Sequence, residues 1–358
     1  MFAWRILDMI FLKKWYFVLF MGLACPLAAQ VAPTSISDFA FTPTDDEGYT
    51  QAWNIDFRGK DVFLYVTYLI SNTGPGTWNN GVSVLLYRNG QSRIWTAEYS
   101  GKSLKAQPGS FGHKSGTSRI AFENGKLVLH AENPGGGASP KEALAIDLTL
   151  TPVGRGIQIS GGKLEPRPGS FLRADIPIAA SAGQLHMTIG GVSESINGIG
   201  GMEAIWANKS PHSYAKRFLL ARTFTADQGI MLGGYTGSGG VEDFLLRYAI
   251  LQKGSVKASG NVSKIEILAS QADGFSGYTI PTSVRYTLND NCTIQEDRKY
   301  FAGGFDVLGS VSALLRWVLR VFFARPYVMH YDASLVYACH DAKPLSVIAQ
   351  TSYYLINP

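Results

Sequence analysis

Apolar and polar residues alternate along much of the chain, and this alternation limits the fold more than any other feature of the sequence. In residues 143–150, leucine or isoleucine occupies every second position, and alanine, aspartate or threonine lies between them. Residues 185–189 and 284–288 repeat the pattern. Successive side chains of a strand point to opposite faces, so this period of two predicts antiparallel strands with one buried face.

Turn signals separate these segments at short intervals. They include NTGPG from Asn72, RNG from Arg88, ENG from Glu123, NPGGG from Asn133 and GSGG from Gly237. The 39 glycines and the charged fraction of 16% also favour many short strands joined by tight turns. A chain of 358 residues is long enough for two such domains. We predict an all-β protein with two consecutive antiparallel barrels, residues 30–195 and 196–358.

One helix is expected to interrupt the strand pattern near the C-terminus. Apolar residues recur at helical spacing from Leu315 to Phe322, and Pro326 ends the segment because proline lacks an amide donor. The predicted helix, Val307 to Ala324, is apolar around most of its circumference. Such a helix either packs against the outside of a barrel or makes transient contact with a membrane surface.

The first 29 residues form a segment of their own, which we interpret as a secretory signal. Arg5, Lys13 and Lys14 precede an apolar run from Trp15, and small residues at positions 28 and 29 offer a cleavage site. The run is shorter than the roughly 20 residues that span a bilayer, so a retained anchor is the weaker alternative. We therefore expect export, to the periplasm, the cell envelope or the medium.

The cysteines fit that compartment. Cleavage would remove Cys25, where glycine replaces the bulky residue that a lipoprotein site requires three positions earlier. Cys292 and Cys339 would remain, and an oxidising compartment allows a disulfide between them, with two buried thiols as the alternative. No cysteine or histidine pair has the spacing of a zinc site, so we predict neither a metal nor another cofactor.

The charge of the chain argues against one class of partner. The net charge is +5, and the signal segment carries three cations and one acid, so the cleaved chain would carry about +3. The sequence contains no block of lysine or arginine with interleaved aromatic residues. We therefore predict no binding of nucleic acid.

The segment from Asn197 to Phe218 carries the candidate chemistry. Its glycines match neither of the common phosphate-binding patterns, and they suit a sharp bend between closely packed strands. Glu203 follows in an apolar setting, where desolvation would raise its pKa and make it a proton donor. The alternative is a structural role, with Glu203 accepting hydrogen bonds from Trp206, Arg217 or the backbone.

Four segments together resemble one known family in the same order. They are residues 61–87, 198–218, 272–288 and 305–331. They are similar to the lipocalin-like proteins of the fungal survival-factor type and, more distantly, to the carotenoid hydratase and AttH-like group. The resemblance implies two consecutive lipocalin-like barrels with a helix in the C-terminal region. It also implies survival of oxidative stress and transport of ceramide-type lipids for the first group, and chemistry on isoprenoid or polyketide chains for the second.

The resemblance to the hydratases is partial at the candidate site. Gly198, Gly200 and Trp206 match the hydratase pattern, whereas Gly201 stands in place of its tyrosine. Glu203 stands in place of its aspartate, and alanine replaces the histidine that follows. We therefore expect a binding protein rather than an enzyme.

We predict an exported lipocalin-like protein that encloses a hydrophobic small molecule, a lipid or an isoprenoid, inside at least one barrel. By resemblance, it is linked to survival of oxidative stress. The residues expected to line the site are aromatic, with two polar tethers: Trp53, Tyr65, Tyr68, Trp78 and Trp206, with Glu203 and Arg217. The alternative is a hydratase or cyclase acting on an isoprenoid or polyene, with Glu203 as its proton donor.

Overall fold

The computed structural model describes most of the chain after the predicted signal segment. The described residues are 32–46, 48–72, 79–132, 142–159, 164–209, 211–225, 227–237, 243–307, 326–340 and 342–356. They form strands, arranged in two barrel-like sheets, and three short 3-10 helices. The prediction of an all-β fold with two barrels is confirmed. The predicted helix lies outside the described residues, apart from Val307 at its start.

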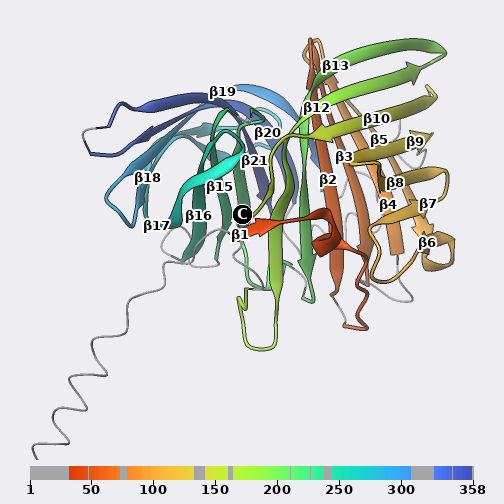
Figure 1. Cartoon of the computed structure of the whole chain (residues 1–358), viewed down its shortest axis with the longest axis horizontal. Helices are drawn as coiled ribbons and strands as arrows, with labels where there is room; N and C mark the ends of the chain where they lie inside the picture. Colours follow the sequence, from red (N-terminus) through yellow and green to blue (C-terminus); the bar gives the residue numbers. More distant parts are fainter. Residues whose placement is uncertain are drawn as a thin grey trace, which may run out of the picture. The chain divides into compact units, whose positions relative to one another are not determined.

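The first sheet has 13 strands and is an incompletely closed barrel (Figure 1). Its main path runs β5-β4-β3-β2-β13-β12-β10-β9-β8-β7-β6, and β1 joins it through β11 and β12. The strands are β1 (Ala32–Thr34), β2 (Thr50–Gly59), β3 (Val62–Ser71), β4 (Asn79–Arg88), β5 (Gln91–Ser100), β6 (Leu104–Ala106), β7 (Gly112–Ser115), β8 (Ser118–Glu123), β9 (Lys126–Glu132), β10 (Leu144–Pro152), β11 (Gly156–Gln158), β12 (Leu172–Ile189) and β13 (Val192–Ala207).

The second sheet is a closed antiparallel barrel in which the strands pair in chain order (Figure 1). Its strands are β14 (Arg217–Arg222), β15 (Gln228–Thr236), β16 (Phe244–Gln252), β17 (Ser255–Ala272), β18 (Thr279–Leu288), β19 (Thr293–Asp306), β20 (Tyr327–Ala338) and β21 (Leu345–Leu355). The 3-10 helices are η1 (Ile36–Phe39), η2 (Gly101–Ser103) and η3 (Pro211–Ser213).

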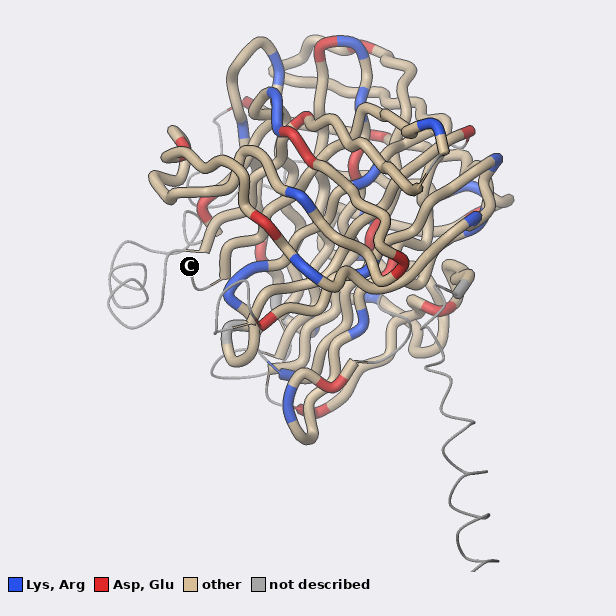
Figure 2. The backbone as a smooth tube through the Cα atoms, turned by 90° about the vertical axis from the view of Figure 1, so that its left-hand side faces the viewer, with Lys and Arg blue, Asp and Glu red and all other residues tan. Residues whose placement is uncertain are grey.

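The alternation seen in the sequence fixes which side chains are buried. On β10, Leu144, Ile146, Leu148 and Leu150 are at most 1% exposed, whereas Asp147 faces solvent. These apolar side chains join a large cluster inside the first sheet, and a second cluster fills the closed barrel. Basic and acidic residues are mixed along the strands instead of gathering by sign (Figure 2).

The glycines of β13 bring two strands unusually close together. A Cβ atom at Gly198 would lie 2.0 Å from the carbonyl oxygen of Arg58, and one at Gly200 would lie 2.3 Å from that of Asp56. Any side chain at these positions would therefore collide with the backbone of β2. The close approach of two backbones that was expected at this glycine-rich segment is present.

The predicted boundary between the barrels, at residues 195 and 196, falls inside a strand. β13 continues to Ala207 and pairs along its length with β12 and then β2. The glycine-rich segment therefore belongs to the first sheet, and the second barrel begins with β14. The sequence pattern placed the boundary too early because a bend within a strand and a link between domains share the same residue types.

A disulfide joins Cys292 to Cys339 within the closed barrel. It ties the turn between β18 and β19 to the end of β20, across a separation of 47 residues. The chain-entropy account gives such a loop roughly 4 kcal/mol of stabilisation. The disulfide alternative, left open by the sequence, is the one that the structure contains.

Among the described residues, no helix has the length and apolarity needed to cross a membrane.

Candidate functional site

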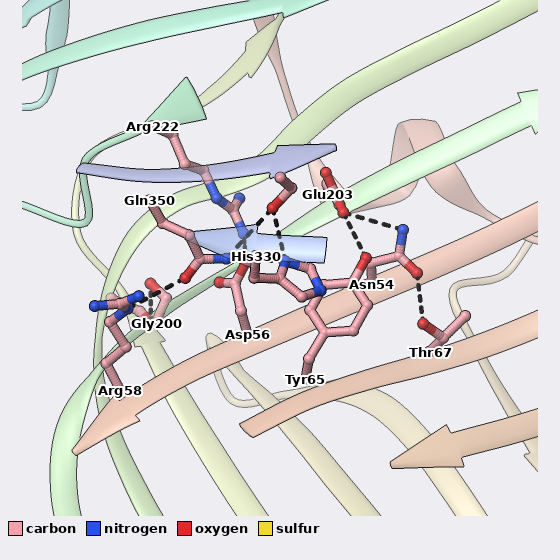
Figure 3. A network of polar contacts seen from close by, with 12 residues as sticks. Asn54, Asp56, Arg58, Tyr65, Thr67, Gly200, Glu203, Arg222, His330 and Gln350 are labelled. Carbon is pink, nitrogen blue, oxygen red and sulfur yellow. Dashed lines mark hydrogen bonds and ion pairs between the residues drawn. The ribbon is translucent and has the colours of Figure 1, made fainter. Parts of the chain in front are cut away.

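A polar cluster lies between the two sheets, on the face of each that points away from its apolar interior. Figure 3 shows its side chains. The residues come from six strands and are buried or partly buried: Asn54, Asp56 and Arg58 on β2, Tyr65 on β3, Glu203 on β13, Arg222 on β14, His330 on β20, and Gln350, Ser352 and Tyr354 on β21. On β2, the residues between them, such as Ile55 and Phe57, point into the first sheet.

Glu203 is the best-anchored acid of the cluster. It is 5% exposed and accepts hydrogen bonds from Asn54 Nδ2 at 3.1 Å, from the Tyr65 hydroxyl at 2.9 Å and from the Tyr354 hydroxyl. All three bonds end on Oε1, so Oε2 makes no hydrogen bond with the described residues. Thr67 Oγ1 donates in turn to Asn54 at 2.8 Å, which fixes the orientation of the amide (Figure 3).

The two tyrosines are permanent donors. Burial, followed by the adjacent Glu203 carboxylate, raises the pKa of Tyr65 and of Tyr354 well above the usual value of a phenol. The two hydroxyls are 2.8 Å apart, so either can donate to the other in place of Glu203. Both phenols therefore keep their protons near neutral pH.

A second acid, Asp56, lies in the same cluster and is paired with Arg222. Both side chains are 2% exposed, and Arg222 Nη2 donates to Asp56 Oδ2. Burial raises the pKa of Asp56 to about 6, while the Arg222 cation opposes the shift and the Glu203 carboxylate adds to it. The charge of the Glu203 carboxylate therefore influences the ionisation of Asp56.

His330 also belongs to the polar cluster, and it is uncharged near neutral pH. It is 0% exposed, and its Nδ1 lies 2.8 Å from Ser352 Oγ. Burial, together with the cations of Arg58 and Arg222, lowers the pKa of His330 to about 3. Its ring centroid is 4.2 Å from that of Tyr65, so the imidazole supports the tyrosine that donates to Glu203.

An apolar cavity adjoins Glu203 between the two sheets. It has a volume of about 580 Å³, part of it open to solvent. Its walls come from both sheets: Leu172, Ala174 and Ile176 on β12, Ile205 on β13, Phe218 and Leu220 on β14, Gly233 and Tyr235 on β15, and Leu245 on β16. Glu203, Tyr354, Asp175 and Arg247 are polar groups in the lining.

The structure brings together only some of the predicted site residues. Tyr65 and Glu203 meet between the sheets. Trp53 and Tyr68 lie in the packed interior of the first sheet, where the Trp53 indole donates to the Phe39 carbonyl at 3.1 Å. The Tyr68 hydroxyl bonds to the backbone carbonyls of Arg119 and His130 at 2.9 and 2.7 Å.

The other predicted residues lie elsewhere. Trp206 packs edge-on against Phe171, with ring centroids 4.9 Å apart. Arg217 lies at the start of β14 on the face that carries Leu219, which points into the closed barrel. Trp78 lies outside the described residues. The partners expected for Glu203 in a structural role, Trp206 and Arg217, are thus replaced by Asn54, Tyr65 and Tyr354.

Sequence reasoning missed the rest of the cluster. Asn54, Asp56 and Arg58 alternate with apolar residues on β2, a pattern that indicates a solvent-facing side of a strand. The closed barrel covers that side, so the three become buried or partly buried polar groups. The polar alternation was a usable signal, but nothing in it shows which partner covers the face.

The fold matches several solved structures, whereas the sequence matches no family model and no curated protein. An AttH-like protein from Nitrosomonas europaea has a TM-score of 0.63 at 10% identity, over 89% of this chain and 96% of that one. The structure of CghA with Sch210972 has a TM-score of 0.59 at 10% identity, over 91% of this chain and 95% of CghA. Kievitone hydratase from Nectria haematococca has a TM-score of 0.55 at 10% identity, over 92% of this chain and 94% of the hydratase. These similarities establish the lipocalin-like double-barrel fold.

Proposed function

We propose that the cavity between the two sheets binds an apolar, unsaturated small molecule, such as a lipid or an isoprenoid, and that Glu203 exchanges a proton with it. The observation that carries the proposal is the position of Glu203 in the lining of an otherwise largely apolar cavity. Ligand sites are typically apolar clefts with a few placed polar groups. The proposal moves the expected binding site from the inside of a barrel to the contact between the two sheets.

The geometry of Glu203 favours acid–base chemistry in addition to binding. Three donors hold Oε1, and Oε2 has no hydrogen-bond partner among the described residues. A protonated Oε2 would give its proton to one carbon of an alkene, leaving a cation on the neighbouring carbon. Water would add to that cation, and the proton released would return to the carboxylate. A second alkene of the same molecule attacking the cation would give cyclisation instead.

The cavity is narrow for a ligand. The enclosed part of this slot is small, because its volume of about 580 Å³ includes space that is open to solvent. A ligand would therefore extend into the open part. Burial of its apolar surface would favour binding by roughly 25 cal/mol for each Å² removed from water.

Binding can be tested with methyl cis-parinarate, a fluorescent and uncharged polyene. We expect saturable binding by the purified protein, and loss of binding when Leu220 in the cavity wall is replaced by tryptophan. The matched control is Leu232→Trp, because Leu232 points into the closed barrel instead. Equal binding by wild type and Leu220→Trp would contradict this location for the site.

Proton transfer can be tested by isotope exchange. Compounds extracted from the protein with organic solvent are incubated with it in heavy water and then analysed by mass spectrometry. We expect deuterium to enter the bound compound, and Glu203→Gln to slow this by a factor of about 10²–10⁴, the usual contribution of a general acid. Glu296→Gln, at a buried acid inside the closed barrel, should leave exchange unchanged. Exchange that survives in Glu203→Gln would exclude Glu203 as the proton donor.

Export is part of the proposal and has one supporting observation. The Cys292–Cys339 disulfide fits the oxidising compartment to which the N-terminal segment would direct the chain. Detection of a mature N-terminus near position 30 in the periplasm or medium would test export.

The resemblance to survival factors extends the proposal to oxidative stress, which predicts that cells lacking the protein lose viability faster under peroxide.

A further inference from the structure

The two bonded cysteines meet a histidine, His340, at one end of the closed barrel. Cys292 directly precedes β19, and Cys339 directly follows β20. The two strands pair as far as Thr293 and Ala338, the residues next to the cysteines, so the register of the sheet brings the two sulfurs together. None of the three side chains belongs to the lining of the proposed ligand cavity. This cluster is therefore separate from the site described above.

His340 lies against the sulfur of Cys339, with its Nδ1 at 3.2 Å from Cys339 Sγ. One possible metal-binding atom from each of Cys292, Cys339 and His340 lies within 4.8 Å of the other two. No other three histidine, cysteine or acidic side chains come this close in the part of the chain that the structure describes. Zinc binds sulfur at about 2.3 Å and nitrogen at about 2.0 Å, so its tetrahedral ligands are roughly 3.5–3.8 Å apart. The cluster is thus close to the size of a zinc site.

Exposure to solvent increases across the cluster from one side chain to the next. Cys292 is 0% exposed, Cys339 is half-buried and His340 is exposed. Asp290 Oδ1 accepts a hydrogen bond from the Cys292 amide at 3.2 Å, which holds the turn that carries the buried sulfur. An ion bound by all three side chains would lie at the surface of the barrel, with water as its fourth ligand. Three protein ligands and a water are a common zinc coordination.

The backbone of His340 directs its imidazole toward this position. Its φ of 45° lies in the left-handed region, which glycine or asparagine adopts more readily. Strained residues of this kind gather at functional sites. The contact between the imidazole and the Cys339 sulfur is thus made from a turn that is costly for this residue.

We propose that Cys292, Cys339 and His340 bind zinc when the disulfide between the two cysteines is reduced. An external dithiol gives the disulfide two electrons and two protons, which makes two thiols, and the dithiol becomes a disulfide itself. The thiols release their protons to solvent as the two sulfurs and the imidazole bind the ion. In the reverse exchange an external disulfide takes up the two electrons and two protons, and zinc is released. No local sequence pattern shows this site, because 47 residues separate the cysteines.

The test uses Co²⁺, which takes the place of zinc and absorbs light when thiolates bind it. The full chain is reduced with dithiothreitol, freed of it by gel filtration under nitrogen and titrated with Co²⁺. We expect the reduced protein to bind one ion with a thiolate-to-metal absorption band, and Zn²⁺ to remove the band by displacing Co²⁺. The oxidised protein should show no band, because its sulfurs are joined to each other.

His340→Asn keeps both thiols and removes the imidazole. Loss of a residue that only supports a metal ligand costs about 10–100-fold in affinity, so loss of a ligand should weaken Co²⁺ binding by more than about tenfold. The matched control is His186→Asn, at an exposed histidine of the first sheet, which should bind Co²⁺ like the wild type. A reduced wild-type chain without the band, or equal affinity in His340→Asn, would overturn the site.

Circular dichroism keeps the test decisive if reduction unfolds the chain. Co²⁺ should then restore the fold of the reduced wild type and of His186→Asn, because metal binding would replace the lost crosslink. It should not restore the fold of His340→Asn at the same concentration. A reduced wild type that stays unfolded in Co²⁺ would equally overturn the site.

Discussion

Two buried glutamates are held in similar ways in two regions of this protein. Glu296, inside the closed barrel, accepts hydrogen bonds from the hydroxyls of Tyr286 at 2.8 Å and Tyr353 at 3.4 Å. Glu203, between the sheets, accepts them from Tyr65 and Tyr354. A glutamate bonded to two tyrosines therefore does not by itself identify a functional site. The difference is the cavity, whose lining includes Glu203.

The two regions also differ in what surrounds the acids. The interior of the barrel is packed with apolar and aromatic side chains, and Arg298 stacks on the rings of Tyr331 and Tyr353 at 4.8 and 4.7 Å. Between the sheets, the Asp56–Arg222 pair and neutral His330 lie beside a slot with largely apolar walls. We infer that the barrel interior provides stability and the contact between the sheets provides function.

The largest expected effect comes from the buried pair between the sheets. Arg222→Met would leave the Asp56 carboxylate buried without its cation, and we expect the free energy of unfolding to fall by about 3–5 kcal/mol. Urea denaturation measures it. The exposed pair of Arg285 and Glu266 is the comparison, because Arg285→Met should cost less than about 1 kcal/mol. Equal losses for the two variants would show that the contact between the sheets is solvated.

The pH dependence compares a histidine in each region. Burial lowers the pKa of His113, inside the first sheet, and of His330, between the sheets, to about 3. The folded state keeps both neutral, whereas the unfolded state binds a proton below pH about 6.5. The stability that each provides is therefore complete above pH 6.5 and is lost as the pH falls toward 3.

Each histidine should cost about 2 kcal/mol of stability between pH 7 and pH 5. We expect His113→Phe and His330→Phe each to remove about that much acid sensitivity, measured by urea denaturation at the two pH values. An effect for His113→Phe alone would indicate that water enters the contact between the sheets.

Packing distinguishes the same two regions. Leu232 is 0% exposed inside the closed barrel, whereas Leu220 is 8% exposed and lines the cavity. Leu232→Trp overfills a packed core and should cost about 1–3 kcal/mol. Leu220→Trp has the slot to enter, so thermal denaturation should show a smaller loss than for Leu232→Trp. A larger loss for Leu220→Trp would contradict the difference in packing.

The smallest stability effects come from the tyrosine hydroxyls. Tyr286→Phe and Tyr354→Phe each delete one hydrogen bond to a buried glutamate, and each should cost about 1 kcal/mol. Deuterium exchange into the bound compound should change only in Tyr354→Phe, because Tyr354 belongs to the cavity and Tyr286 to the barrel interior. A comparable change in Tyr286→Phe would remove the functional distinction between the regions.

The sequence was informative about strands and much less so about the site. The alternation at residues 143–150 predicted the buried face of β10, because a period of two is a local property of one strand. The hydrogen bond between Tyr354 and Glu203 joins residues 151 positions apart, and the one between Arg222 and Asp56 spans 166 positions. Such contacts depend on how two sheets pack, which no local pattern records.

Glu203 was found because an acid among apolar residues stands out locally, whereas Asp56 was missed because it alternates with apolar neighbours like any solvent-facing residue. Trp53 and Tyr68 show the opposite case. Aromatic residues line ligand sites and fill cores alike, and these two fill the core of the first sheet.

The central claim is that a ligand binds between the two sheets and not inside either one. A crystal structure of the protein with methyl cis-parinarate tests it most directly. The account predicts electron density for the polyene against Glu203, between β12 and β13 on one side and β14 to β16 on the other. Density inside the closed barrel, among the side chains around Glu296, would contradict it.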